Sequence, residues 1–299
     1  LTPITALELG SLSLEAGFPP GVFNIVNGEP EMIGKVLSTN PVIKKITFTG
    51  STEVGKLLMK NSSSTVKNIS LELGGNAPFI VFSDADLDAA LNGFMMAKFR
   101  NAGQTCISAN RLFVHKSVSN IFTSKLLERL KKLKVDDGMN GSDIGPLISN
   151  EALKKVINHV SDAKKNGAKI LFGGNKHKLG GLFFEPTLIS NVKKNMKVFQ
   201  KENFGPIIPL IEFDNDDEVI NMSNETNYGL AAYFYTKNST TIWKNLNNLD
   251  YGMFGINSGK ISTYLNPFGG LKESGIGREG SLQCLDPFLE TKFALWNYD

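Results

Sequence analysis

A chain of 299 residues is long enough to form one large domain or two ordinary ones around a hydrophobic core. Hydrophobic residues make up 41% of it and charged residues 20%, which is typical of a globular protein and excludes extended disorder. The 32 basic and 29 acidic side chains leave a net charge of only +3, which is too small to indicate a nucleic-acid partner.

The first 82 residues alternate between helical and extended patterns. Residues 1–16 predict a helix that Thr2 caps and Gly17 ends. Extended patterns follow at 21–28, 43–50, 66–73 and 77–82, and helical patterns at 29–39 and 51–61. Strands separated by helices of about ten residues indicate a parallel sheet of the nucleotide-binding type.

A second α/β run occupies the rest of the chain. It begins with a strong helical pattern over 83–103, where Ser83 and Asp86 predict a capping box and Gly103 predicts the end. Extended segments are then expected at 111–115, 168–174, 183–189 and 231–236, and helices at 117–132, 150–166, 216–224 and 239–248. The sequence therefore predicts an α/β fold, with a soft domain boundary near residue 71.

Membrane, metal and disulfide chemistry have little support. No stretch approaches the roughly 18 apolar residues that a membrane span needs, and no signal peptide is evident. Cys106 and Cys284 lie far apart and make a poor disulfide framework, so we expect a reducing compartment, the cytoplasm or the mitochondrial matrix. The three histidines stand in unrelated contexts, and no metal site is expected.

Residues 48–57, FTGSTEVGKL, predict a turn from a strand into a helix. The segment nearly completes the phosphate-binding loop of ATPases, but Leu57 stands where that motif needs Ser or Thr. What remains is a turn at Gly50, Ser51 and Thr52 whose free N–H groups would suit a dinucleotide pyrophosphate. An ordinary Ser/Thr-capped turn is the alternative.

Two reactive side chains follow. Glu72 stands between Leu71 and Leu73, where loss of water would raise its pKa toward that of a general base; a carboxylate on an edge strand is the alternative. Cys106 lies in a polar Gly-Gln-Thr loop beyond the next helix. That position suits a nucleophile, and a buried inert thiol is the alternative.

Five motifs occur in the order and spacing of the aldehyde dehydrogenase superfamily. They are FTGSTEVG (48–55), LELGGNAPFIVF (71–82), FRNAGQTC (99–106), ENFGP (202–206) and PFGGLKESGIGREG (267–280). The resemblance covers essentially the whole chain. Within the superfamily the sequence most resembles the succinate-semialdehyde dehydrogenases.

The resemblance implies a role for each matching position. Cys106 would attack the aldehyde carbon, and Glu72 would activate the water that hydrolyses the resulting thioester. Arg100 and Ser262 would bind the distal carboxylate of the substrate; for Arg100 the alternative is a charge favoured by the end of a helix. The positions that would hold NAD or NADP are Gly50, Ser51, Thr52, Gly55, Glu202 and Phe204.

The resemblance also implies a domain plan. Residues 1–71 would be the remaining part of a Rossmann-type cofactor domain, and residues 72–255 an α/β catalytic domain. Residues 256–282 would return to the cofactor domain, and residues 283–299 would form an oligomerisation tail. We therefore expect a homo-oligomer, a dimer or tetramer, although Pro287 removes one possible strand hydrogen bond in that tail.

Besides Cys284 and Pro287 in the tail, the chain departs from the family pattern in two places. Family members carry an earlier stretch with further cofactor-domain strands, so the sequence is interpreted as N-terminally truncated. Ser108 stands where several succinate-semialdehyde dehydrogenases have a second cysteine, so no disulfide switch is expected there.

The expected reaction is the NAD(P)+-dependent oxidation of succinate semialdehyde to succinate. The alternatives are oxidation of another ω-carboxy aldehyde, such as glutarate semialdehyde, or a catalytically inactive fragment that only oligomerises. The choice between NAD and NADP cannot be read from these residues.

Overall fold

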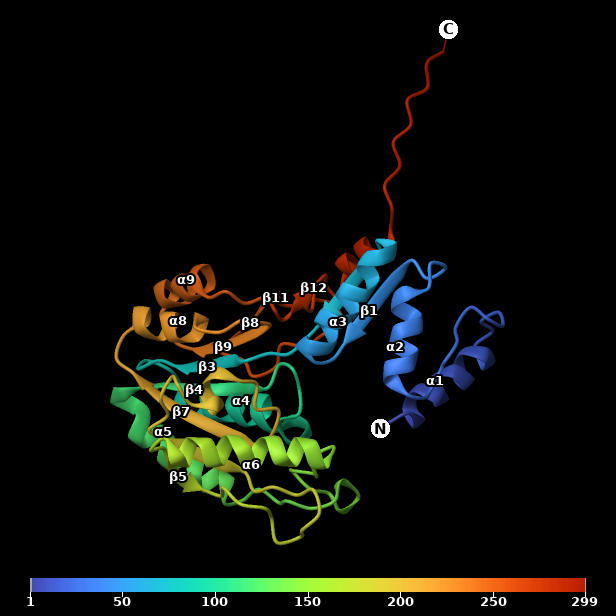
Figure 1. Cartoon of the computed structure of the whole chain (residues 1–299). Coiled ribbons are helices and arrows are strands. Elements are labelled where there is room, and N and C mark those ends of the chain that lie inside the picture. Colours follow the sequence, from blue (N-terminus) through green and yellow to red (C-terminus); the bar gives the residue numbers. More distant parts are fainter. Residues whose placement is uncertain (1, 299) are drawn as a thin grey trace. The chain divides into compact units, whose positions relative to one another are not determined.

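The computed structural model describes residues 2–298, and these fall into two compact units. Within that range one unit comprises residues 2–46 and 56–67, and the other comprises residues 47–55 and 68–298. Figure 1 labels strand β1 (Lys45–Thr49) and helix α3 (Thr52–Ser62). Each of these two elements is divided between the units. All the residues that the sequence analysis selected as a site belong to the larger unit.

The smaller unit contains helices α1 (Ile4–Glu15) and α2 (Pro30–Thr39) and the 3-10 helix η1 (Ser63–Thr65). Helix α1 begins after Pro3 without a side-chain cap, so the prediction that Thr2 caps it is wrong. The predicted strand at 21–28 is also wrong. Val22 and Val26 are exposed there, and the segment pairs with no strand in the described part of the chain, although a strand needs a neighbour for its hydrogen bonds.

The core of the larger unit is a seven-stranded sheet. Its strands are β3 (Ala77–Val81), β4 (Ala109–His115), β5 (Lys169–Phe172), β6 (Thr187–Ser190), β7 (Ile207–Phe213), β9 (Ala231–Tyr235) and β10 (Met253–Ile256). They lie in the order β10-β9-β3-β4-β7-β6-β5, and every neighbouring pair is parallel except β5 with β6. The central strands are buried along their whole length, as expected for a parallel sheet covered on both faces.

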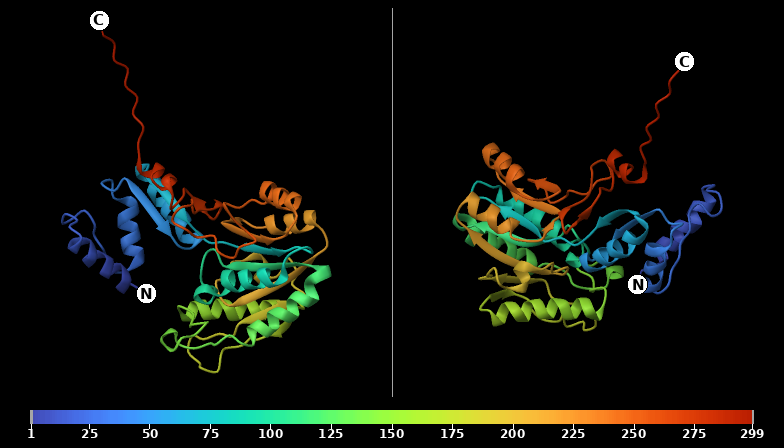
Figure 2. Two further views of the ribbon diagram at one scale, coloured as in Figure 1. Left: turned by 180° about the vertical axis from the view of Figure 1, so that it is seen from behind. Right: turned by 45° about the horizontal axis from the view of Figure 1, so that its top comes forward.

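Helices cover both faces of this sheet (Figures 1 and 2). On one face, α4 (Leu87–Phe99) and α5 (Lys116–Leu130) pack on a core that includes Phe79 and Leu112. On the other, α8 (Asp216–Asn224) and α9 (Ser239–Asn248) pack on a core that includes Ile80 and Phe113. Neighbouring residues such as Phe79 and Ile80 lie on opposite faces because successive side chains of a strand point to opposite sides of the sheet. Helices α6 (Asn150–Lys165) and α7 (Lys197–Gln200) pack over β6 and the start of β7.

Most of the helix starts are fixed by polar caps. Ser149 caps α6, Asn215 caps α8 and Asn238 caps α9, each by accepting a main-chain N–H bond, and the three helices lie within two residues of their predicted ranges. Helix α4 is different. Asp86 alone caps it, through the N–H groups of Asp88 and Ala89, so the predicted capping box that included Ser83 is wrong.

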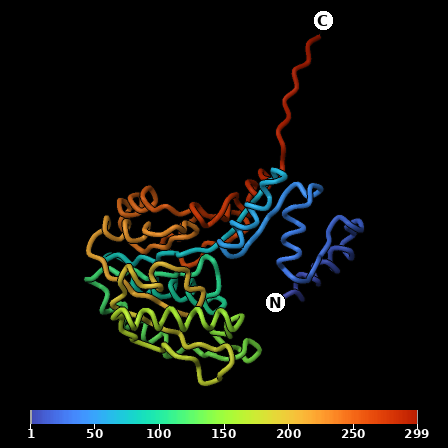
Figure 3. Tube along the Cα trace, in the orientation of Figure 1, coloured from blue at the N-terminus to red at the C-terminus, as the bar shows by residue number. Residues whose placement is uncertain are grey.

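Two small sheets bring distant segments beside the central one. β2 (Asn68–Glu72) lies between β1 and β12 (Gly275–Ile276), and Gly275 pairs with Glu72. A second pair joins β8 (Tyr228–Gly229) to β11 (Leu271–Lys272). A loop of residues 73–76 then joins β2 to β3, along the path of the chain that Figure 3 traces. The glycine-rich segment 267–280 is therefore held against the strand that carries Glu72.

The end of the chain contains two 3-10 helices, η4 (Leu282–Cys284) and η5 (Asp286–Phe288). Residues 289–298 form neither helix nor strand, and the domain plan and the role of the tail stay predictions. No helix among residues 2–298 has the length and apolar character needed to cross a membrane.

Candidate active site

The two predicted catalytic residues and one predicted cofactor-binding residue lie at one edge of the seven-stranded sheet. Glu72 lies just before β3, Cys106 just before β4, and Glu202 just before β7, and these three strands are neighbours. Because parallel strands begin at the same edge, the loops that enter them lie together. The charges of Glu202 and Glu72 both act on the Cys106 thiol, which places the three side chains within electrostatic reach.

The loop between Glu72 and β3 is held on both sides. The Ser274 hydroxyl donates to the carbonyl of Gly74 at 2.7 Å, and the N–H of Gly75 donates to a carboxylate oxygen of Glu202 at 3.0 Å. A side chain at Gly75 would not fit, since a Cβ there would lie 2.3 Å from the main-chain oxygen of Cys106. Gly75 therefore allows this loop to lie directly against the cysteine loop.

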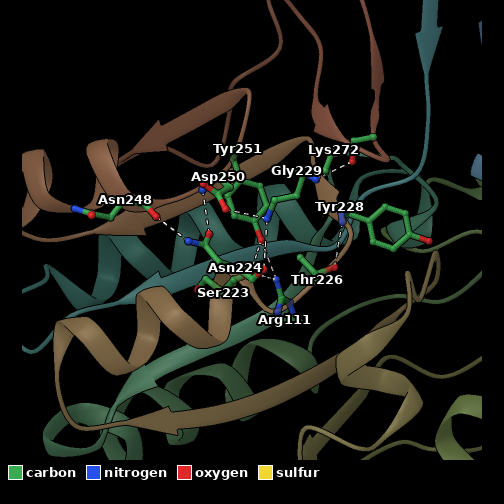
Figure 4. A network of polar contacts seen from close by, with 11 residues as sticks. Arg111, Ser223, Asn224, Thr226, Tyr228, Gly229, Asn248, Asp250, Tyr251 and Lys272 are labelled. Atoms are coloured by element: carbon green, nitrogen blue, oxygen red, sulfur yellow. Dashed lines mark hydrogen bonds and ion pairs between the residues drawn. The ribbon is translucent and has the colours of Figure 1, made fainter.

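Arg111 of β4 anchors the end of the same loop, and Figure 4 shows it beside Ser223 and Tyr251. Its guanidinium is fully buried and donates to the carbonyl of Asn76 at 2.9 and 3.2 Å, to the carbonyls of Met222 and Ser223 at 2.9 and 2.8 Å, and to the Tyr251 hydroxyl at 3.0 Å. The buried cation is satisfied by main-chain carbonyls and a hydroxyl. It joins the start of β3 to the end of α8.

A chain of buried amides continues this network toward the loop before β7. Asn110 donates to the side-chain oxygen of Asn76 at 2.5 Å and accepts the main-chain N–H of Asn203 at 2.8 Å. His159 of α6 is hydrogen-bonded to the side chain of Asn203 at 2.9 Å, and burial lowers its pKa. Asn203 stands between the two predicted cofactor-binding residues of this loop, so the network fixes their backbone.

Glu72 is in the environment that its sequence neighbours predict. Its side chain is only 4% exposed, and one carboxylate oxygen has no hydrogen-bond partner within the described residues. Desolvation, followed by the charge of Glu279, raises its pKa to about 8, and Arg278 opposes the rise. The expected burial is confirmed, and near neutral pH the group can both hold and accept a proton.

Cys106 is a free, partly exposed thiol in the turn that leads into β4. Desolvation, followed by the charges of Glu202 and Glu72, raises its pKa to about 11. The main-chain amides of Cys106 and Ile107 act in the opposite direction by favouring the thiolate. The thiol is therefore protonated at neutral pH, and its reaction needs a nearby base to take the proton.

The loop between α4 and Cys106 has an unusual backbone. Asn101, Ala102 and Gly103 are consecutive residues with φ of +53°, +56° and +77°, and the first two lack the freedom of glycine. The side chain of Gln104 then anchors the loop. It accepts the N–H of Ile148 at 2.9 Å and donates to the carbonyl of Pro146 at 3.2 Å. Ser108, which follows the loop, is buried and donates to a main-chain carbonyl of α4.

A cavity of about 310 Å³ opens beside the cysteine loop. It is bounded by Thr105 and Ile107, the neighbours of Cys106, and also by Arg100 and Ser262, which come from different parts of the chain. The structure therefore brings the two predicted carboxylate-binding residues to one cavity next to the predicted nucleophile.

The structure also adds two residues to this cavity that the sequence analysis missed. Tyr233 of β9 lines the wall and donates its hydroxyl to the carbonyl of Ile107 at 2.7 Å. Lys260 contributes a second cation. The sequence does not place Tyr233 in the cavity, because its position depends on the order of the strands. Lys260 stands two residues before Ser262, so its proximity to that predicted site residue could have indicated it.

The predicted pyrophosphate turn joins β1 to α3. The N–H of Gly50 donates to the main-chain oxygen of Glu72 at 3.0 Å, so the turn is tied to the strand that carries the predicted base. The Ser51 hydroxyl accepts the N–H of Val54 at 3.3 Å. Among the described residues, the N–H groups of Ser51, Thr52 and Glu53 have no hydrogen-bond partner. This donor set fits an anion at a helix N-terminus.

Two further contacts fix the start of α3. The Thr52 hydroxyl donates to the carbonyl of Glu273 at 3.2 Å. Gly55 faces the side chain of Leu73, and a Cβ at this glycine would lie 2.5 Å from it. Gly55 therefore serves close packing of the helix on the loop after Glu72.

A model of the aldehyde dehydrogenase family matches residues 1–294. Over 294 residues the chain is 52% identical to a Sinorhizobium fredii protein named probable succinate-semialdehyde dehydrogenase (NADP+). The match covers 98% of this chain and 60% of that protein. It is 49% identical to a glutarate-semialdehyde dehydrogenase of Pseudomonas aeruginosa, with 98% and 61% covered. A 3-sulfolactaldehyde dehydrogenase of Pseudomonas putida is 47% identical, with 98% and 60% covered.

The fold is also shared with solved structures. A crystal structure of an NADP-dependent enzyme from E. coli superposes with a TM-score of 0.96 at 49% identity, covering 97% of this chain and 60% of that one. The chain thus spans about 60% of the length of the relatives that it matches.

Proposed function

The chain belongs to the aldehyde dehydrogenase family, and we propose that the protein containing it oxidises succinate semialdehyde to succinate with NAD or NADP. The observation that carries the proposal is the meeting of Cys106 and buried Glu72 beside a cavity that contains Arg100. The similarity to proteins named succinate-semialdehyde dehydrogenase, NADP(+)-dependent in two of them, supports the choice of substrate and cofactor.

Cys106 is the proposed nucleophile. Its sulfur bonds to the aldehyde carbon and gives a tetrahedral thiohemiacetal, while the thiol proton passes to a nearby base. The main-chain amides of Cys106 and Ile107, which favour the thiolate, would stabilise the negative oxygen that forms beside the sulfur. Once hydride has left, a thioester remains on Cys106.

Glu72 is the proposed base for hydrolysis of that thioester. With a pKa raised to about 8, a substantial part of the group is ionised at mildly alkaline pH, and it can then take a proton from water that attacks the thioester carbon. Its buried, unpartnered carboxylate oxygen is available to accept that proton.

The proposed cofactor residues lie where the donors are free. The N–H groups of Ser51 and Thr52 at the start of α3 would hold the pyrophosphate, and Glu202 and Phe204 would hold the nicotinamide end. When bound, NAD or NADP supplies the acceptor for the hydride. Because Glu202 also accepts the Gly75 N–H, it is held close to the loop that separates Glu72 from Cys106.

Arg100 is the proposed partner of the substrate carboxylate. Its side chain is exposed in the cavity and makes no hydrogen bond or ion pair with any residue from 2 to 298. A planar guanidinium binds a carboxylate through two parallel hydrogen bonds, and the Ser262 hydroxyl would add a third. Glutarate semialdehyde, one carbon longer, is the second candidate, because the Pseudomonas aeruginosa relative carries that name.

The test is a pair of substitutions in the protein that contains this chain. Cys106→Ala should abolish NAD(P)H formation, whereas Glu72→Gln should form the thioester but hydrolyse it slowly, so that acylated protein accumulates and is detected by mass spectrometry. Cys284→Ala, at the second cysteine, serves as the control and should leave the rate unchanged. Wild-type turnover by Cys106→Ala, or an unchanged steady-state rate in Glu72→Gln without trapped thioester, would refute the assignments.

A further inference from the structure

The cavity beside Cys106 is lined by two basic residues and by no acidic one. Arg100 and Lys260 are the basic members of its lining, and none of the other lining residues is Asp or Glu. The Lys260 ammonium, like the Arg100 guanidinium, forms no hydrogen bond or ion pair with the part of the chain that the structure describes. An anion from outside the chain can therefore pair with both charges without competition from an acidic side chain of the lining.

The backbone at Lys260 is fixed relative to helix α4. A Cβ at Gly259 would lie 2.0 Å from the carbonyl of Gly93, so the segment is pressed against the middle of the helix. Ser258 closes a tight turn, since its hydroxyl donates to the Lys260 carbonyl at 3.0 Å and accepts the Lys260 N–H at 3.2 Å. The same helix leads directly into Arg100, so the two cations are held by one packed unit.

Two cations exceed what a carboxylate requires. A carboxylate has two oxygens in one plane, which the fork of Arg100 can satisfy alone. The ammonium of Lys260 is a compact point charge on a flexible stem and has no geometric preference for a plane. A tetrahedral oxyanion such as a sulfonate or phosphonate offers a third oxygen outside that plane, which suits such a charge.

We propose that Lys260 makes this cavity a binding site for aldehydes whose far end carries a tetrahedral oxyanion, with Arg100 holding two of its oxygens and Lys260 the third. The inference rests on the proposed oxidation of an ω-anionic aldehyde at Cys106 and adds a substrate class to it. The bonds made and broken at the aldehyde carbon are those of that reaction.

The experiment compares four aldehydes of similar length in the protein that contains this chain. They are succinate semialdehyde, 3-sulfopropanal, 3-phosphonopropanal and uncharged butanal. The variant is Lys260→Met, which keeps the aliphatic stem and removes the charge. Lys260→Arg keeps the charge, and Lys165→Met removes another exposed lysine, on α6, as a matched control.

The charge model gives a distinct pattern of kcat/KM. Lys260→Met should lower kcat/KM about tenfold or more for the sulfonate and phosphonate, which corresponds to about 1.4 kcal/mol. For succinate semialdehyde the loss should stay below about threefold, because its two contacts with Arg100 are independent of Lys260. For butanal there should be no loss, because all of its contacts are independent of Lys260. Lys260→Arg should retain most of the preference, and Lys165→Met all of it.

Three results would overturn the inference. Equal losses for the carboxylate and the tetrahedral anions would mean that Lys260 acts only through general charge. No loss for any substrate would remove Lys260 from the site, while the proposed function would stand as long as succinate semialdehyde remained far better than butanal. A wild-type protein that favours no anionic aldehyde over butanal would refute the proposed function and the inference together.

Discussion

Replacing Glu72 by Gln should change the way in which stability depends on pH. In the folded protein, burial and then the charge of Glu279 raise the pKa of Glu72 from 4.5 to about 8. In the unfolded chain the group returns to its ordinary value. Between these two pH values the folded state keeps a proton that the unfolded state has released, so the free energy of unfolding falls as pH rises.

The size of the effect follows from the same interval. Each pH unit between the two pKa values is worth about 1.4 kcal/mol, so the whole interval from 4.5 to about 8 is worth at most about 5 kcal/mol. Relaxation and the entry of water around the carboxylate reduce this figure. We expect wild type to lose about 2–4 kcal/mol from this group between about pH 5 and pH 9, and Glu72→Gln to lose none of it.

Urea unfolding followed by circular dichroism at several pH values measures this difference. The variant leaves a buried amide in place of the carboxylate, and the cost of that amide is independent of pH. The slope against pH is therefore the informative quantity. Glu212→Gln, at an exposed position on β7, is the control and should follow the wild-type slope. Parallel slopes for wild type and Glu72→Gln would refute the argument that the folded state holds the extra proton.

Three further substitutions test the rest of the site. Arg111→Met should lower the free energy of unfolding by about 3–5 kcal/mol, because it leaves buried carbonyls without donors; a loss below about 1 kcal/mol by urea unfolding would contradict this. Asn203→Leu should raise KM for the cofactor about fivefold or more while kcat changes little, because it removes the side-chain hydrogen bonds of Asn203 with His159 and with the carbonyls of Asn110 and Val198, each worth about 1 kcal/mol; steady-state kinetics with Asn203→Asp as the conservative variant decide the point. Arg100→Ala should cost about 2–5 kcal/mol in kcat/KM for succinate semialdehyde and much less for butanal, and equal losses would rule out a role in binding the carboxylate.

Much of the fold could be predicted because its signals are local. Helices α6, α8 and α9 begin at Ser or Asn caps that are visible in the sequence, and the apolar runs of the central strands are continuous. The segment 21–28 has the same apolar character but forms no strand. Pairing decides strand formation, and the sequence of one segment does not contain its partner.

The site was predictable in its parts but not in its assembly. The burial of Glu72 follows from its neighbours in the chain, whereas its approach to Cys106 depends on β3, β4 and β7 being adjacent. The site also lies at the edge where the parallel strands begin. Ligands of open α/β sheets more often lie at the opposite edge, so a general rule would have placed it wrongly.

The network of buried amides could not be predicted from the sequence either. Asn110 and Asn203 are separated by 93 positions and no single motif contains both, but they share two buried hydrogen bonds. A buried amide needs a partner, and the sequence gives the need without the identity of the partner.

The left-handed residues between Arg100 and Cys106 have a consequence for chain length. Asn101 and Ala102 each occupy a conformation that costs about 1–3 kcal/mol, so this backbone has few alternative paths. The proposed anchor for the far end of a substrate and the proposed nucleophile are therefore joined by a short, stiff connection. In the proposed reaction this connection would fix the distance between an anion and an aldehyde through the main chain, and with it the number of carbons between them, independently of the size of the cavity.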